Sequence, residues 1–221
     1  MSLRICMPTS EFAPFAKTGG LADVAAGLSD YLSRIGQDVR AFLPLYDTIN
    51  LRGTDLHRVE GVSDVAIDMG HRTYTFSLFT ARVPDTMQWL YLVDCPALYH
   101  RGHFYAEDGD EHVRFGFFSR AVIESCQRMG WAPHIFHLND WHTGLIPLYL
   151  RTVYGWDTLF AQTRSMLTIH NIGYQGVFGA DALNELGLAR HAGSLHQDDL
   201  YHGHLSFMKS GIIYADRIST V

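Results

Sequence analysis

The sequence lacks an excess of basic residues, and this limits the partners that the protein can have. Its 17 lysines and arginines are outnumbered by 23 aspartates and glutamates, which gives a net charge of −6. Non-specific binding to nucleic acid requires a basic face that attracts phosphate groups. The composition therefore argues against a nucleic-acid partner.

Long apolar runs and cysteines are also scarce. No stretch approaches the roughly 18 apolar residues that a membrane-spanning helix needs, so we predict no membrane segment. The start of the chain, MSLRICMPTSEF, is unlike a secretory signal peptide. The three cysteines, Cys6, Cys95 and Cys126, have spacings unlike a zinc or disulfide framework. A reducing cytoplasm is the expected location.

What is present is the composition of a globular domain. Of the 221 residues, 47% are hydrophobic and 18% are charged, which is enough apolar material for a substantial core. The sequence ends on an apolar, strand-like segment, without the exposed polar residues that usually close a domain. We therefore expect it to be part of a longer protein.

The order of expected elements predicts a doubly wound α/β fold. Strands at 3–9 and 38–43 flank a helix in which apolar residues recur at helical spacing over 21–35. Such a strand–helix–strand unit implies parallel strands joined by a right-handed crossover. We expect residues 1–221 to form one domain around a mostly parallel, Rossmann-like sheet.

The middle of the chain adds a β-hairpin region. Segments 56–62, 72–81 and 87–93 are rich in β-forming residues, with turns expected at 68–70 and 84–85, and predict antiparallel or edge strands. After them we expect a loop at 95–111, a helix at 115–129, a strand at 133–138, a helix near 144–154, a strand at 165–169, helices near 180–186 and 205–214, and a final strand.

Three loops that leave expected strand ends carry unusual polar residues. They cover residues 10–20, 139–142 and 170–176. In an open α/β sheet, ligands bind beyond the C-terminal ends of the strands. We therefore predict that these loops meet in one site.

The first loop contains Lys17, Gly19 and Gly20 directly before a helix. Glycines let backbone amides approach a ligand, and the helix N-terminus and the lysine add positive charge. The loop suits a phosphate, a diphosphate or a carboxylate, although its spacing is neither a Walker A motif nor a dinucleotide fingerprint. The alternative interpretation is a simple glycine turn with a solvated lysine.

The second loop includes Asp140, Trp141 and His142 after a strand that contains His134 and His137. A metal site is not expected, because a strand places His134 and His137 on opposite faces. Asp140 and His142, just past the strand end, are placed to bind sugar hydroxyls. Trp141 either stacks on a sugar ring or packs under the next helix.

The third loop places His170 and Asn171 at a strand end, before Gly173 and Gly176. An imidazole can bond a hydroxyl or act as a general acid or base, and an asparagine both donates and accepts hydrogen bonds. Taken alone, the loop indicates a polar site without defining its chemistry.

Together these loops resemble those of bacterial glycogen synthases and plant starch synthases. The matching segments, in order, are KTGGLAD at 17–23, DWHTGL at 140–145, TIHNIGYQG at 168–176, LSFMKSG at 205–211 and YAD at 214–216. The resemblance covers essentially the whole chain and corresponds to the first of the family's two domains. It implies the GT-B architecture, with a nucleotide-binding C-terminal domain that this sequence does not contain.

The resemblance also implies an activity and a set of site residues. Members of the family transfer glucose from ADP-glucose to the non-reducing end of an α-1,4-glucan, with retention of configuration and without a metal or cofactor. By motif match, Lys17, Gly19 and Gly20 face the donor diphosphate, and His170 meets the transferred glucose, close to Asp140 and Asn171. The residues expected on the acceptor side are Tyr99, His142, Tyr174 and Gln175.

Two further expectations come from the same resemblance. Glu11 and Asp23 lie near the cleft and are expected to order the glycine-rich loop. His202 is a departure, because some members of the family have an asparagine there that contacts the donor sugar.

Two alternatives to the transferase remain open from the sequence. One is a non-catalytic glucan-binding module, since the second wall of the cleft is missing. The other is a different α/β nucleotide enzyme, such as a GT-B epimerase or an oxidoreductase, although the absence of a dinucleotide fingerprint argues against NAD.

Overall fold

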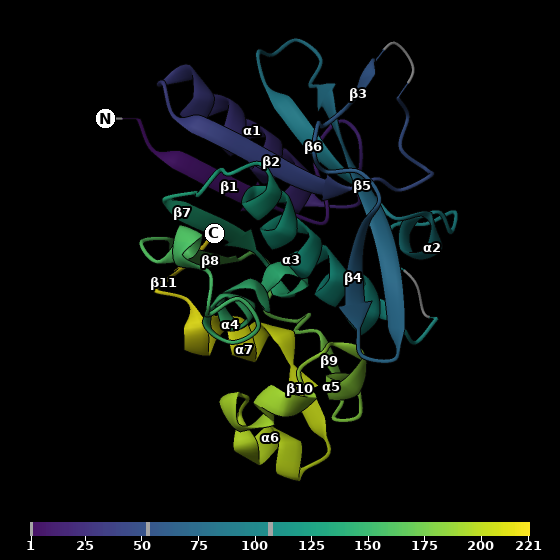
Figure 1. Cartoon of the computed structure of the whole chain (residues 1–221). Helices are drawn as coiled ribbons and strands as arrows, with labels where there is room; N and C mark the ends of the chain where they lie inside the picture. The colour runs from purple at the N-terminus through teal and green to yellow at the C-terminus, as the bar shows by residue number, and fades with distance from the viewer. Residues whose placement is uncertain (1, 52–53, 106–107) are drawn as a thin grey trace.

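A computed structural model describes residues 2–51, 54–105 and 108–221 (Figure 1). Its main sheet contains β1 Arg4–Pro8, β2 Asp38–Pro44, β3 Leu56–Arg58, β4 Val65–Met69, β5 Arg72–Arg82, β6 Trp89–Asp94, β7 Ile135–Asn139, β8 Arg164–Ile169 and β11 Arg217–Thr220. The strands lie in the order β11-β8-β7-β1-β2-β6-β5-β3, and β4 pairs with β5. From β11 to β6 each neighbouring pair is parallel, which confirms the predicted Rossmann-like sheet.

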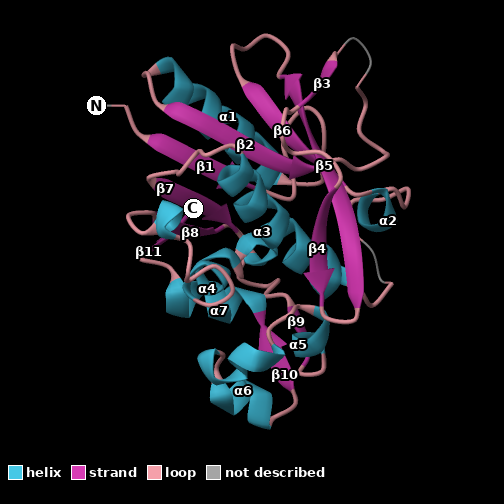
Figure 2. Ribbon diagram, viewed as in Figure 1, coloured by secondary structure: helices cyan, strands magenta, loops and turns pink. Residues whose placement is uncertain are grey.

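The helices that connect the parallel strands lie on both faces of the sheet (Figure 2). Their bounds are α1 Gly20–Arg34, α3 Glu111–Arg128, α4 Ile146–Arg151 and α7 Phe207–Tyr214. Right-handed crossovers place α1 on one face and the other three helices on the opposite face. The predicted helix near 144–154 is shorter than expected, with Pro147 in its first turn, where a missing N–H costs nothing.

Helix α3 forms the centre of the core, because most of its residues are buried. Phe115, Phe117, Phe118 and Val122 are fully buried, as expected for a helix covered by other elements around its circumference. Arg114, on the same helix, is also fully buried. Its guanidinium donates to the carbonyls of Leu98 and Phe104 and pairs with Glu111, which satisfies the charge inside the fold.

The β-hairpin region is confirmed as antiparallel, but one strand was missed. Strand β5 is antiparallel to β3, β4 and β6, and the turn at 84–85 is present. The turn expected at 68–70 is present but displaced: Gly70 lies in it together with His71, whereas Asp68 and Met69 belong to β4. Gly70 adopts a left-handed φ of 64°, which glycine tolerates without strain.

Several short elements were not predicted. They are α2 Pro96–Tyr99 in the expected loop, the ribbon of β9 Val177–Gly179 and β10 His204–Ser206, the helix α6 Gln197–Tyr201, and 3-10 segments at Trp141–Thr143, Thr158–Phe160 and Ala189–Ser194. The helix expected near 180–186 is present as α5 Ala182–Glu185. The ribbon and its two helices project below the sheet in Figure 1. No helix within the described residues is both long and apolar enough to cross a membrane.

Candidate active site

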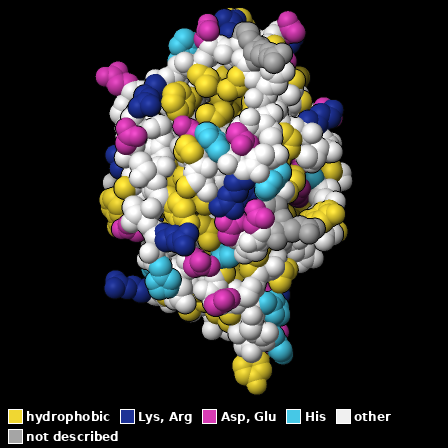
Figure 3. Space-filling model, turned by 90° about the vertical axis from the view of Figure 1, so that its right-hand side faces the viewer, with side chains coloured by type: hydrophobic (Ala, Val, Ile, Leu, Met, Phe, Trp, Pro, Cys, Tyr) yellow, Lys and Arg dark blue, Asp and Glu magenta, His cyan; other side chains and the backbone are white. Residues whose placement is uncertain are grey.

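The three loops do meet at one edge of the sheet, beyond the ends of β1, β7 and β8. These strands are adjacent and parallel, so their C-terminal ends share an edge. A cavity of about 670 Å³ lies there, lined by Glu11, Thr18, Gly19, Gly20, Leu21, Val24, Tyr105, Glu111, Asp140, Trp141, His142, His170, Asn171, Tyr174 and Val221. Figure 3 views the molecule from the side toward which β1 and β2 point in Figure 1, and shows charged side chains beside apolar ones.

A larger hollow, of about 980 Å³, lies away from these loops. It is formed by the start of β6, the end of β5 and the last turns of α1, at the opposite ends of the strands from the loops. Because none of the predicted site residues lines it, we place the candidate site in the smaller cavity.

The glycine-rich loop is ordered by Glu11, as expected. Glu11 Oε2 accepts hydrogen bonds from the amides of Thr18 at 2.7 Å and Gly19 at 3.0 Å, and Oε1 accepts one from the Thr18 hydroxyl at 2.6 Å. Burial alone would raise the pKa of Glu11, but these bonds, with one from Tyr105, lower it. The Gly19 amide is thus already engaged, and Gly20 is the first residue of α1.

Lys17 lies beside the cavity instead of lining it. Its Nζ is 2.7 Å from Asp23 Oδ1, and both side chains are about half exposed. An exposed pair of this kind is worth little, about 0–1 kcal/mol. A ligand with two or more negative charges can therefore draw Lys17 from Asp23 at small cost.

Asp140 links the second loop to the third. Its Oδ1 accepts hydrogen bonds from the amides of His170 at 2.8 Å and Asn171 at 3.2 Å. Its backbone has φ 54° and ψ −172°, a region that is nearly restricted to glycine and costs about 1–3 kcal/mol. Burial raises the pKa of Asp140, although the two amides and the His170 ring oppose this.

The tautomer of His170 follows from its neighbour Asn139. The Asn139 amide donates to the carbonyls of Pro8 at 3.1 Å and His137 at 3.3 Å, so its oxygen is the acceptor for His170 Nε2 at 3.0 Å. Nε2 therefore carries the proton, and Nδ1 is left as an acceptor. Burial lowers the pKa of His170 more than the Asp140 charge raises it, which keeps the ring neutral near pH 7.

His142 forms part of an aromatic wall. Its ring stacks on Trp141 with centres 4.0 Å apart, on Tyr105 at 5.2 Å, and meets the edge of Phe115 at 4.5 Å. Burial, helped by the Arg114 charge, lowers the pKa of His142 to about 3. The wall thus presents a neutral imidazole among apolar rings, a surface that suits the C–H face of a sugar.

Comparisons with known proteins identify the family of the chain. A family model described as the starch synthase catalytic domain matches residues 4–221. The chain belongs to this family. The glycogen synthases of Syntrophotalea carbinolica and Aeromonas salmonicida are 39% and 40% identical to it, each over 99% of this chain and 45% of the relative. The chain therefore spans about half the length of the curated relatives it matches.

A solved structure from the starch synthase family gives the same result for the fold. The catalytic domain of starch synthase IV from Arabidopsis thaliana, bound to ADP and acarbose, matches with a TM-score of 0.88 and 30% identity. The match covers 99% of this chain and 44% of that one. The fold described above is therefore that of the first half of a GT-B starch synthase.

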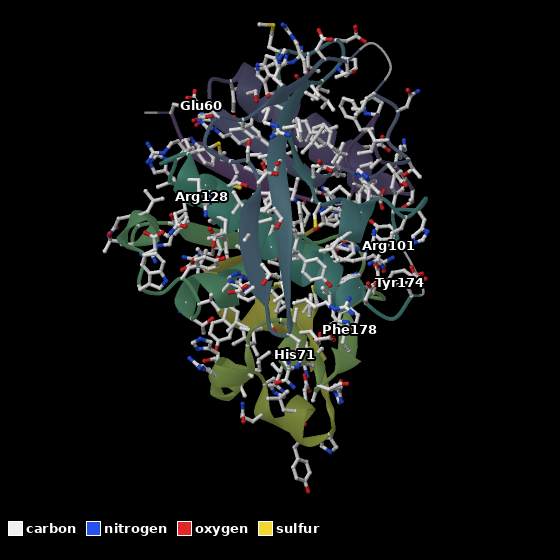
Figure 4. The ribbon with its side chains drawn as sticks, turned by 45° about the vertical axis from the view of Figure 1, so that its right-hand side comes forward. Glu60, His71, Arg101, Arg128, Tyr174 and Phe178 are labelled. Atoms are coloured by element: carbon white, nitrogen blue, oxygen red, sulfur yellow. The ribbon has the colours of Figure 1, made fainter. Side chains whose placement is uncertain are left out.

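Within this family fold, the later residues of the third loop lie toward the rim. Tyr174 is 70% exposed and lines both the cavity and a neighbouring hollow of about 470 Å³. Gln175 and Phe178 line only the second hollow. Figure 4 shows Tyr174 at the outer edge of the molecule, on the same side as Arg101. The two hollows share Glu111, Trp141 and Tyr174, so they adjoin.

The structure places Tyr99 in the core instead of on the acceptor side. The side chain is fully buried, and its hydroxyl donates to the Arg114 carbonyl at 3.0 Å. The reason is that Tyr99 ends the unpredicted helix α2, which packs against α3. The β9–β10 ribbon and the helices α5 and α6 form a projecting lobe. His202 lies in this lobe, where its Nδ1 is 2.8 Å from the Asp198 carbonyl, and it does not line the cavity.

Sequence reasoning missed Tyr105 and Glu111 as cavity residues. Both lie in or next to the segment expected to be a loop, 95–111, which is dense in aromatic, histidine and glycine residues. That density was the available signal, since binding residues are often found on loops held by a rigid scaffold. The spacing of these residues carries no recognisable pattern.

Proposed function

We propose that this chain is the N-terminal half of a glycogen or starch synthase that transfers glucose from ADP-glucose to the non-reducing end of an α-1,4-glucan. The observation that carries the proposal is the meeting of the three loops around one cavity, in a family whose solved member was bound to ADP and acarbose. ADP represents the product of the donor, and acarbose is an oligosaccharide analogue. The full-length enzyme is this chain joined to the second, nucleotide-binding half.

Some residues of this half face the sugar donor, and others face the glucan acceptor. Charge develops on the leaving diphosphate, and it is met by the Gly20 end of α1 and by Lys17 once Lys17 leaves Asp23. His170 offers Nδ1 as an acceptor for a hydroxyl of the transferred glucose. Asp140 keeps the amides of the third loop in place, and His142 and Tyr174 form the acceptor side.

The proposed transfer proceeds with retention of configuration and needs no metal or cofactor. Positive charge from Lys17, from the α1 N-terminus and from basic residues of the second half takes the part that a cation has in other phosphoryl and glycosyl transfers. Since the second wall of the cleft is absent from this chain, we expect the isolated half to be inactive. The proposed compartment is the cytoplasm.

The test is a direct assay of the full-length enzyme. The expected result is release of ADP from ADP-glucose that depends on added glycogen. UDP-glucose is assayed separately as an alternative donor. A folded full-length protein that releases no ADP would contradict the transferase. Maltooligosaccharide binding by such an inactive protein, detected by calorimetry, would then favour the glucan-binding module.

A further inference from the structure

Tyr105 belongs to none of the three loops, yet it contacts two parts of the cavity wall. Its hydroxyl lies 2.8 Å from Glu11 Oε1 and 2.9 Å from Ser10 Oγ. Its ring stacks on His142, with ring centres 5.2 Å apart and planes inclined by 30°. The side chain therefore connects the glycine-rich loop to the aromatic wall that follows β7.

The hydroxyl reaches the glycine-rich loop through the Glu11 carboxylate. Glu11 is only 4% exposed, and a buried carboxylate is stable as an anion only when donors surround it. Thr18 and Gly19 supply donors from the loop itself. The Tyr105 hydroxyl donates to Glu11 from outside residues 10–20.

Tyr105 remains a donor over the whole physiological range. Burial raises the pKa of the Tyr105 hydroxyl, so the proton stays on the oxygen at neutral pH. The Glu11 oxygens can only accept, since the carboxylate is ionised. The direction of the Tyr105–Glu11 bond is thereby fixed, and the carboxylate cannot rotate without losing it.

We propose that Tyr105 is a positioning residue whose hydroxyl and ring act on different substrates. The hydroxyl fixes Glu11, and through it the turn at Thr18 and Gly19, in the shape that receives the donor diphosphate. The ring supports His142 on the acceptor side. The proposal rests on the proposed function, because it takes ADP-glucose as the donor and glucan as the acceptor.

Tyr46 provides a matched control for the hydroxyl. It is also a buried tyrosine that tethers the same loop, since its hydroxyl donates to the Ser10 carbonyl at 3.1 Å. It does not bond Glu11 and does not line the cavity. Removal of its hydroxyl therefore loosens the loop without releasing the carboxylate.

The experiment compares Tyr105→Phe, Tyr105→Leu and Tyr46→Phe in the full-length enzyme. Tyr105→Phe keeps the ring and loses the bond to Glu11, so it should raise the KM for ADP-glucose about tenfold, the scale of one hydrogen bond to a charged group. The KM for glycogen should stay within about twofold of the wild-type value, because the ring still supports His142. Tyr105→Leu removes both contacts and should raise both constants.

Binding of ADP, measured by calorimetry, gives a readout that does not need turnover. Its Kd should rise in Tyr105→Phe and stay near the wild-type value in Tyr46→Phe. An unchanged donor KM in Tyr105→Phe would overturn the proposal, and so would an equal increase in Tyr46→Phe. If the wild-type enzyme transfers no glucose, the proposed function fails, and ADP binding by the three variants still decides the role of Tyr105.

Discussion

At the scale of single residues, the Lys17–Asp23 pair shows that a predicted site residue need not line the cavity. The sequence motif predicts that Lys17 faces the donor diphosphate, and the structure pairs it with Asp23 at 2.7 Å instead. Both side chains are about half exposed, so solvent weakens the pair and leaves Lys17 able to move. We therefore expect Lys17 to leave Asp23 and contact the diphosphate only when an anionic ligand is present.

Replacement of Lys17 by alanine should lower turnover in the full-length enzyme about 100-fold, the usual effect of losing one group that stabilises the leaving charge. Glycogen binding should change little, because Lys17 does not line the acceptor side. Steady-state rates and a glycogen-binding assay measure the two effects. Arg34→Ala is the control, since the exposed Arg34 forms an equally short pair with Asp30 far from the cavity. Equal losses of turnover and binding would contradict the role.

His170 leads to a prediction about pH. Its pKa is lowered by burial, so NMR titration of the ring should give a midpoint below the ordinary value of about 6.5, with the proton on Nε2 in the neutral form. As the pH falls through that midpoint, Nδ1 gains a proton and ceases to accept, so transfer should decline on the acid side. A midpoint at or above 6.5 would be evidence against the buried, neutral ring.

At the scale of elements, the predictable parts are those with a regular apolar pattern. The strands before the three loops and the helices at 20–34 and 111–128 were found because period and burial agree in them. The strand at 65–69 was missed because the sequence Asp-Met-Gly is typical of a turn. The ribbon of β9 and β10 has only three residues per strand. Phe178 packs it against Phe207, with ring centres 5.0 Å apart. Local sequence does not show such a contact.

The site residues also fall into those that the sequence could predict and those that it could not. Asp140 and His170 were predictable because each follows a buried strand and carries a polar group to the same edge. Tyr105 and Glu111 reach the cavity only through the packing of α3, and Tyr99 is withdrawn from it by the short helix α2. Such placements depend on which elements touch, and one sequence without a structure does not specify them.

A substitution at Gly70 tests the contact between the β4–β5 hairpin and helix α5. A Cβ at Gly70 would lie 1.7 Å from the Asn184 carbonyl oxygen, whereas one at Gly61 meets nothing within 4 Å. Both glycines have positive φ, 64° and 77°. Gly61→Ala should lower the free energy of unfolding by about 1 kcal/mol from backbone strain alone, and Gly70→Ala by about 2–4 kcal/mol, because overpacking adds to the strain. Urea denaturation measures both, and equal losses would contradict the contact.

At the scale of the whole molecule, buried histidines make stability depend on pH. Burial lowers the pKa of His137 to about 4 and of His142 to about 3, while the unfolded values are about 6.5. Below pH 6.5 the unfolded chain binds protons that the folded chain does not, so stability falls with acidification. Each histidine contributes about 1.4 kcal/mol per pH unit down to its folded pKa.

Urea denaturation between pH 5 and 6.5 measures this dependence. The slope of the unfolding free energy against pH should decrease in His137→Asn by the amount that corresponds to about one bound proton, because that histidine no longer titrates on unfolding. His202→Asn is the control, since the His202 side chain is more than half exposed. An unchanged slope in His137→Asn would contradict the buried, neutral ring.

The carboxylate of Glu11 has a consequence for which anions the cavity accepts. It sits where a free sulfate or phosphate would otherwise settle at the head of α1, and it already uses the Thr18 and Gly19 amides. A small inorganic ion therefore meets a resident negative charge. In the proposed full-length enzyme, we expect the base and ribose of a nucleotide diphosphate to be bound by the second half. The diphosphate could then extend past the Glu11 charge toward Gly20 and Lys17, and the site should prefer it to a small inorganic ion.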